Sequence, residues 1–295
     1  MSDLKKILLD YGIGAEYQER FDFSSSSTIG VGGKTLGIVY PSTLKEVVKL
    51  IDLFEEQGIE YLVLGNMSNV LPPDSFLKKV VVSTLKLKNT EFSKGVFSEA
   101  GARSGPFLDE CEKYGYTGAE FLAGIPCTIG GAVYMNAGAN GKYISDIIKR
   151  VLVYEGKQLR LLPRSACAFG YKKSRFMQKD SVILGVEFDL QRCDPTLVKE
   201  NRLSVLKFRR DLPKGKSAGC IFKNPLGDSA GRLIEGAGLK GFRVGGAVVS
   251  EKHANFIINE GNATSEEIIS LISIIKNAVY KKYKILLEEE VRILE

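Results

Sequence analysis

Side chains capable of acid–base or nucleophilic chemistry are few in this sequence and widely spaced. Only one histidine, His253, occurs in 295 residues, which excludes any site that needs two imidazoles. A Ser/His/Asp triad could use only this residue, and we interpret His253 as a structural, hydrogen-bonded imidazole. CxxC spacing is absent, which argues against a zinc knuckle or a thioredoxin-type motif, and we predict no metal site. The five cysteines are Cys111, Cys127, Cys167, Cys193 and Cys220.

Cys220 differs from the other cysteines in its surroundings. It ends a turn of small residues that begins at Ser217, and Lys223 and Asn224 follow it. A cysteine at such a place is either a small buried hydrophobic residue or a proton donor whose reactivity nearby cations tune. We keep both interpretations open at this point.

A second candidate is the acidic run Glu288–Glu290 near the end of the chain. Adjacent charges usually form a solvated surface. We predict that 284–295 forms a final strand, in which successive side chains would point to opposite faces. One of these carboxylates would then point inward.

Two segments rich in small residues are candidates for ligand binding. One is the loop 65–69, and the other is 118–141, which holds six glycines, five alanines and Glu120 as its only charge. Small residues let backbone N–H groups approach an anion closely, which would suit a ligand with a pyrophosphate and a flat ring system. Alternatively, the glycines only permit tight turns against a sheet. A complete Walker loop is absent, and no GxGxxG lies between a predicted strand and a helix, which argues against an NTPase and a Rossmann site.

These candidates must be positioned by a mixed set of helices and strands. A strand over 36–40, a helix from Thr43 to Gly58 and a strand over 59–64 predict a small α/β layer with a ligand loop after the second strand. A β-rich region follows Lys78, and a polar helix begins near 194. A helix capped by Thr264 and Glu267 precedes the final strand. Its predicted buried stripe is Ile268, Ile269, Ile272, Ile275 and Val279.

Composition places the chain among ordinary globular proteins, with 44% hydrophobic and 26% charged residues. The net charge of +6 is spread along the chain, which argues against nucleic-acid binding. The first residues do not have the pattern of a signal peptide, and no apolar run reaches the ~18 residues of a membrane span. Cysteines at scattered spacing fit a reducing cytoplasm.

Four motifs, in this order, resemble the UDP-N-acetylenolpyruvoylglucosamine reductases, also called UDP-N-acetylmuramate dehydrogenases. They are GAEFLAGIPCTIGGAVYMNAGANG (118–141), SAGCIFKNP (217–225), AGRLIEGAGLKGFRVGGAVVSEKHANFIIN (230–259) and EVR (290–292), and the likeness covers about residues 28–292. The resemblance implies an α+β chain with an FAD-binding fold of the PCMH/vanillyl-alcohol-oxidase type. Two α/β subdomains (1–78 and 79–195) would precede a C-terminal α+β substrate domain (196–295), whose final strand returns to the active site. The chain looks like the short form that lacks an extra substrate-covering loop.

The family's reaction is what the resemblance implies for activity. NADPH would reduce a non-covalent FAD, and hydride would pass to the enolpyruvyl group of a UDP-sugar enolpyruvyl ether, giving UDP-N-acetylmuramate. This reaction serves peptidoglycan precursor synthesis in the bacterial cytoplasm. We expect a monomer with no nucleic-acid or membrane partner. The alternative is a paralogue that binds FAD or a sugar nucleotide but does not turn over, or acts on another substrate.

The resemblance also implies residue roles. Cys220 falls at the position of the proton donor, Glu290 at that of the catalytic glutamate, and Lys172 at that of a catalytic arginine, whose charge but not bidentate fork it reproduces. Met67 and Cys127 stand where the family has glycine. The implied substrate-binding residues are Tyr171, Lys223 and Asn224, and the implied FAD-binding residues are Gly65, Asn66, Ser68, Asn69, Gly124, Ile125, Pro126, Thr128, Gly130, Gly131, Asn136, Ala137 and Gly138.

Overall fold

The computed structural model describes residues 4–178 and 181–295, which form two compact units. Each unit is assembled from three stretches of the chain. One of the points where the chain passes from unit 1 to unit 2 lies between Asn66 and Met67, inside the loop 65–69. Unit 1 contains the described parts of Met1–Glu19, Gly37–Asn66 and Lys79–Arg210. Unit 2 contains Arg20–Leu36, Met67–Lys78 and Asp211–Glu295.

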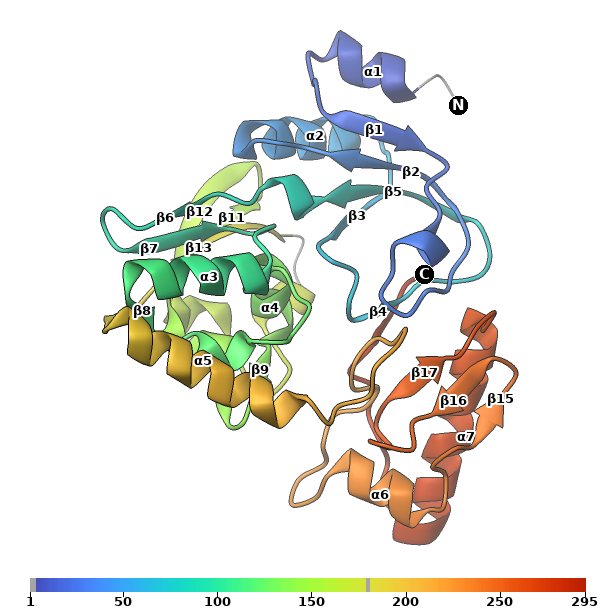
Figure 1. Cartoon of the computed structure of the whole chain (residues 1–295). Helices are drawn as coiled ribbons and strands as arrows, with labels where there is room; N and C mark the ends of the chain where they lie inside the picture. Colours follow the sequence, from blue (N-terminus) through green and yellow to red (C-terminus); the bar gives the residue numbers. More distant parts are fainter. Residues whose placement is uncertain (1–3, 179–180) are drawn as a thin grey trace. The chain divides into compact units, whose positions relative to one another are not determined.

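The predicted strand–helix–strand layer forms the first part of unit 1. Its four-stranded sheet has the order β1-β2-β5-β3, in which β3 and β5 are parallel (Figure 1). Thr43 caps α2 by accepting a hydrogen bond from the Glu46 backbone N–H at 3.1 Å, while the Glu46 carboxylate returns to Ser42. The elements are α1 (Leu4–Asp10), β1 (Glu16–Glu19), β2 (Thr35–Tyr40), α2 (Leu44–Glu56), β3 (Tyr61–Leu64) and β5 (Leu77–Ser83).

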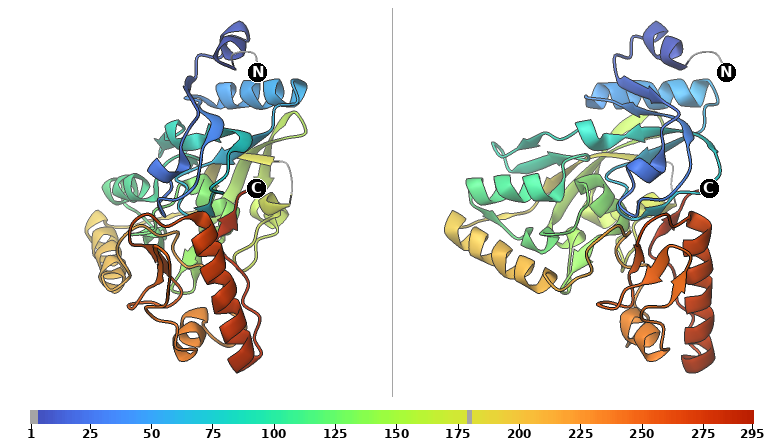
Figure 2. Two further views of the ribbon diagram at one scale, coloured as in Figure 1. Left: turned by 90° about the vertical axis from the view of Figure 1, so that its right-hand side faces the viewer. Right: turned by 45° about the vertical axis from the view of Figure 1, so that its right-hand side comes forward.

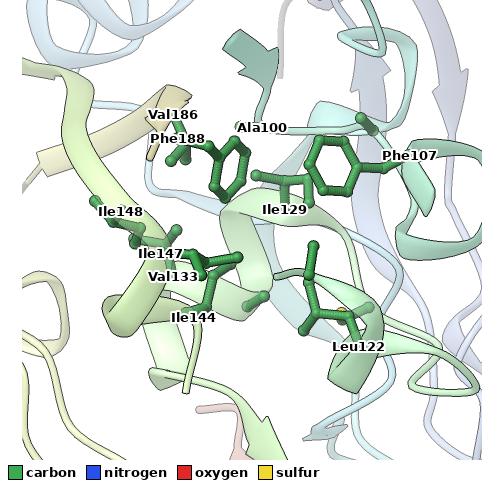
Figure 3. Close-up of a cluster of buried hydrophobic side chains, with 14 of the residues drawn as sticks. Ala100, Phe107, Leu122, Ile129, Val133, Ile144, Ile147, Ile148, Val186 and Phe188 are labelled. Atoms are coloured by element: carbon green, nitrogen blue, oxygen red, sulfur yellow. The ribbon is translucent and has the colours of Figure 1, made fainter. Parts of the chain in front are cut away.

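A five-stranded antiparallel sheet, ordered β12-β11-β13-β7-β6, forms the second part of unit 1. Its core is apolar, and Figure 3 shows Ile129 and Val133 of α4 among side chains from this sheet and from α3. Ile129, Ala132 and Val133 of α4 are buried in this cluster, which fixes the helix inside the segment 118–141. The elements are β6 (Thr90–Glu91), β7 (Val96–Glu99), α3 (Ser104–Tyr114), α4 (Ile129–Met135), β11 (Ile148–Glu155), β12 (Gln158–Pro163), β13 (Ser181–Phe188) and α5 (Pro195–Arg209).

Two short antiparallel strand pairs complete unit 1. β8 (Tyr116–Thr117) pairs with β14 (Gln191–Arg192), and β9 (Gly138–Ala139) pairs with β10 (Lys142–Tyr143). The helix expected near 194 is α5, and it belongs to unit 1. The three-domain division at 78/79 and 195/196 stays a prediction.

Unit 2 packs two helices against a three-stranded sheet of order β15-β16-β17. α7 lies along this sheet, with α6 beside it (Figure 2). The predicted capping box of α7 is confirmed, since Thr264 and Glu267 exchange side-chain-to-backbone hydrogen bonds at 3.0 and 3.1 Å. The elements are β4 (Val70–Leu71), α6 (Ala230–Gly236), β15 (Arg243–Val244), β16 (Ala247–Val249), β17 (Ile257–Asn259), α7 (Ser265–Tyr283) and β18 (Arg292–Ile293).

Two predictions for the C-terminal region were wrong. Ile269 is 38% exposed, and Leu271 takes its place in the buried stripe, because the stripe follows the 3.6-residue period from Ile268. The final strand is limited to Arg292–Ile293, which pairs in parallel with β4. The preceding 284–291 makes one isolated bridge, between Glu289 and Phe222, instead of a continuous ladder.

No helix within 4–178 and 181–295 combines the length and hydropathy that crossing a membrane requires. All five cysteines lie within these residues, and no disulfide joins any of them.

Candidate active site

In unit 1, the two segments rich in small residues contact each other. The Asn66 side-chain amide, just beyond β3, donates a hydrogen bond to the Pro126 carbonyl at 2.8 Å. Gly65 lies so close to Thr128 that a Cβ at position 65 would come within 2.2 Å of the Thr128 Oγ1. A side chain at 65 would therefore push the two segments apart.

The start of α4 supplies the second side of this contact. Thr128 is buried and caps the helix, its Oγ1 accepting from the Gly131 N–H at 3.2 Å. Gly124 and Pro126 are exposed and Ile125 is half-buried, so the loop before the cap faces outward. Gly65 lies beside this exposed loop and has no side chain. A ligand can therefore approach the backbone closely here, and these residues fit an FAD phosphate.

The other open interpretation, glycine for tight packing, also holds at two positions. A Cβ on Gly130 would lie 2.8 Å from the Ala100 Cβ, so glycine lets α4 lie close to the strand end at Ala100. Gly138 likewise packs within the β9–β10 pair, where a Cβ would meet the Lys142 carbonyl at 2.4 Å.

Asn136 joins the end of α4 to two other segments. It has a φ of +44°, the left-handed conformation common for asparagine at a helix C-terminus. Its side-chain amide donates to the Gly170 carbonyl at 2.8 Å, and its side-chain oxygen accepts from the Ser145 N–H at 3.2 Å. Both polar atoms thus have protein partners, and Asn136 is only 4% exposed. Its predicted role at the FAD stays a prediction.

Tyr171 and Lys172 form the tip of a tight turn in unit 1. Gly170 and Lys173 close it with two backbone hydrogen bonds of 3.0 and 3.2 Å, and Lys172 has a φ of +50°. Behind the turn, the fully buried Ser174 donates its hydroxyl to the Tyr134 carbonyl at 2.6 Å. The end of α4 therefore holds both ends of the turn that displays Lys172.

The loop 65–69 continues into unit 2, where Met67 replaces the family's glycine. Met67 has a φ of +50°, so its backbone keeps the left-handed conformation that glycine adopts most easily. Ser68 is half-buried. Asn69, predicted to bind FAD, donates its side-chain amide to the Glu290 carbonyl at 3.1 Å.

In unit 2, Cys220 and Glu290 lie on neighbouring extended segments. The Glu290 N–H donates to the Ile221 carbonyl at 2.7 Å, and the Lys223 N–H donates to the Glu288 carbonyl at 2.8 Å. On its other side, Cys220 forms an antiparallel bridge with Phe256. The predicted proton donor and the predicted catalytic carboxylate are therefore held in adjacent segments by backbone hydrogen bonds.

The acidic run is divided among different partners. Glu288 forms an ion pair with Lys223 at 2.5 Å, and Glu289 forms one with Lys276 at 2.6 Å. Glu289 and Glu290 are both half-buried, and the catalytic role of Glu290 stays a prediction. Neither the solvated-run interpretation nor the alternating-strand interpretation describes all three residues.

The two predicted substrate residues beside Cys220 also have protein partners. Lys223 carries the ion pair just described, and the exposed Asn224 accepts the Ala230 N–H at 3.0 Å at the start of α6. Their contacts with substrate stay predictions. Lys172 belongs to unit 1 and Cys220 to unit 2, and their convergence also stays a prediction.

His253 is a structural imidazole, as expected. Its Nδ1 accepts the Asn255 N–H at 3.2 Å, and its ring packs edge-on against Phe256 with centroids 5.1 Å apart. Burial lowers the pKa of His253, and the positive charge of Lys240 lowers it further. The neutral ring is thus favoured, which the accepted hydrogen bond requires.

Comparison with known proteins agrees with this two-part organisation. Residues 35–158 match the family of FAD binding domains, and residues 211–294 match the C-terminal domain of UDP-N-acetylenolpyruvoylglucosamine reductase. The reductase of Caldicellulosiruptor bescii is 37% identical over 287 residues, covering 95% of this chain and 91% of that protein. The reductase of Carboxydothermus hydrogenoformans is also 37% identical, covering 95% of both chains. The chain belongs to the UDP-N-acetylenolpyruvoylglucosamine reductase family.

A solved structure supports the same assignment. The UDP-N-acetylenolpyruvylglucosamine reductase of Thermus caldophilus superposes with a TM-score of 0.82 at 31% identity, covering 95% of this chain and 99% of that one. The predicted fold class, an FAD-binding fold with a C-terminal domain, is confirmed. The sequence motifs did not indicate a role for Ser174 or Asn255. Both are buried polar residues whose hydrogen-bond partners lie 40 and 33 positions away in the chain.

Proposed function

We propose that this chain is an NADPH-dependent flavoprotein that reduces UDP-N-acetylglucosamine enolpyruvate to UDP-N-acetylmuramate. Membership of the reductase family and the match to the FAD binding domains support the reaction and the cofactor. The observation that carries the proposal is the backbone hydrogen bond between Glu290 and Ile221. It holds the residue with the Glu290 carboxyl group beside the segment that carries the Cys220 thiol. The nucleotide sugar and NADPH are metabolites of the cytoplasm, where we place the protein, acting as a monomer.

With FAD bound, the site would carry out hydride transfer, from NADPH to the methylene carbon of the substrate's enolpyruvyl group. Gly65, Asn66 and the loop 124–128 would hold its phosphates, because they form the exposed contact between the two segments of small residues.

The chain's own side chains then manage charge and a proton. Hydride addition places negative charge on the substrate carboxylate, as an enolate. The Lys172 ammonium and the Glu290 carboxyl would stabilise that charge where it develops. The Cys220 Sγ–H would deliver a proton to the carbon next to the carboxylate, and water could then reprotonate the thiolate. Tyr171, Lys223 and Asn224 would orient the substrate.

Anaerobic stopped-flow measurement of the two half-reactions tests the proposal. We expect the purified protein to carry a flavin absorbance that NADPH bleaches, and UDP-N-acetylglucosamine enolpyruvate to restore it with formation of UDP-N-acetylmuramate. A protein that NADPH bleaches but this substrate fails to reoxidise would contradict the proposal and favour a paralogue of altered substrate.

A further inference from the structure

The segment Cys220–Lys223 in unit 2 runs between two other stretches of chain. One is 288–290, which it meets through the Glu290 and Lys223 backbone hydrogen bonds described above. The other is 253–256. On that second side Phe256 forms a bridge with Cys220, and Asn255 supplies three hydrogen bonds to the segment.

Asn255 binds two consecutive residues of this segment. Its carbonyl accepts the Ile221 N–H at 2.9 Å. Its side-chain oxygen accepts the Phe222 N–H at 2.9 Å, and its side-chain amide donates to the Phe222 carbonyl at 2.8 Å. The side chain thus reproduces the paired hydrogen bonds of an antiparallel ladder where the backbones do not pair. Asn255 is 3% exposed and Phe222 is 1% exposed, so water does not replace these bonds.

We infer that Asn255 is a positioning residue that sets the register of Cys220 against Glu290. The inference rests on the proposed function. Ile221 donates to Asn255 with its N–H and accepts from Glu290 with its carbonyl, so it links the two sides directly. Loss of the Asn255 amide would leave both backbone groups of Phe222 unpaired in an apolar place, and the segment would shift to satisfy them. A shift of about 1 Å in a reacting group costs on the order of 10²-fold in rate.

Asn259 provides a matched control. It is also buried, at 6% exposure, and its side chain bonds only backbone groups, donating to Ile29 and Gly30 and accepting from Gly261 and Ala263. None of these partners belongs to Cys220–Lys223. Asn259→Ala therefore removes four side-chain-to-backbone hydrogen bonds from unit 2, against two in Asn255→Ala, without touching that segment.

The test compares Asn255→Ala with Asn259→Ala in FAD-loaded protein. For Asn255→Ala, we expect reoxidation by UDP-N-acetylglucosamine enolpyruvate to fall on the order of 10²-fold, with flavin reduction by NADPH changed less than about twofold. Asn259→Ala should leave both rates within about twofold. Equal loss in both half-reactions, or the same pattern in both variants, would overturn the inference.

Asn255→Asp adds a pH signature that a general loss of stability would not produce. The ionised carboxylate cannot donate to the Phe222 carbonyl, whereas the protonated carboxyl can donate and accept like the native amide. Burial raises the pKa of a carboxyl, so protonation should occur within reach of neutral pH. We expect the reoxidation rate of Asn255→Asp, divided by that of the wild type, to rise as pH falls. A ratio that stays flat would contradict the inference.

Hydrogen exchange gives a reading that needs no turnover and no stable variant. In wild-type protein the Phe222 N–H should exchange slowly. A second reading is the rate at which Cys220 is alkylated, followed by peptide mass spectrometry, and this rate should be higher in Asn255→Ala than in the wild type. If the wild type shows no turnover of this substrate but these readings hold, the proposed function fails while the positioning role stands. Fast exchange at Phe222 in the wild type would overturn the positioning role itself.

Discussion

A thiol and a hydroxyl are of similar size, and either can donate a proton to carbon. We therefore expect Cys220→Ser to keep substantial turnover. Cys220→Ala should slow substrate-dependent reoxidation by about 10²–10⁴-fold, the usual contribution of a general acid, while NADPH still reduces the flavin. Stopped-flow absorbance of each half-reaction checks this. An equal loss in both half-reactions of Cys220→Ala would show a packing role instead.

Lys172 has a positive charge and a left-handed backbone conformation. The substitution Lys172→Gly removes the charge but keeps that backbone conformation favourable, so it tests the two properties separately. Lys172→Gly suits the φ of +50° better than lysine does, so the turn should be kept or stabilised by about 1 kcal/mol. The same change removes the cation and should slow reoxidation by about 10²–10³-fold. Lys172→Arg restores the charge and should restore most of the rate. Unfolding midpoints measured beside the two half-reactions separate these effects, and an unchanged rate in Lys172→Gly would exclude Lys172 from catalysis.

His253 should make stability depend on pH in a definite direction. Its pKa is lowered in the folded protein by burial and by Lys240, an effect that the opposite charge of Glu235 partly offsets. As pH falls through the ordinary histidine value of about 6.5, the unfolded chain takes up the proton first, so stability is lost. Urea midpoints of wild type and His253→Gln should differ by a constant amount above about pH 7. Below that, the wild type should lose its advantage, and parallel curves at all pH values would contradict the assignment.

At the scale of elements, Asn136 ties α4 to the turn that displays Lys172. Asn136→Gly keeps the left-handed helix end but removes both side-chain hydrogen bonds, at a cost of about 1–3 kcal/mol. We expect faster hydrogen exchange at Gly170 and Lys173, with FAD affinity changed little. If Asn136 instead binds FAD directly, affinity will fall while exchange in this turn stays the same.

At the scale of the whole molecule, FAD should stabilise unit 1 through the contact between Gly65–Asn66 and the loop before α4. A ligand at 100 times its Kd stabilises the folded state by about 2.7 kcal/mol. Removing FAD should lower the unfolding temperature, and adding it back should restore the temperature and protect residues 65–66 and 124–131 from hydrogen exchange. Protection confined to other segments would show that the cofactor binds elsewhere.

Short-range patterns were enough for much of this protein. The strand at β2, the capped helices α2 and α7, and the structural role of His253 were predictable because neighbours in sequence determine them. Long motifs identified the family, and with it the FAD-binding fold and the reaction class.

Contacts between distant residues could be decided only by the tertiary structure. Spacing did not show that Asn255 holds Phe222, that Glu288 and Glu289 pair with lysines, or that 284–291 forms one isolated bridge and no ladder. The physical reason is that a buried amide or carboxylate is stabilised by whichever partner the fold brings within about 3 Å. Sequence patterns report periodicity and local caps, whereas those partners depend on how segments far apart in the chain pack together.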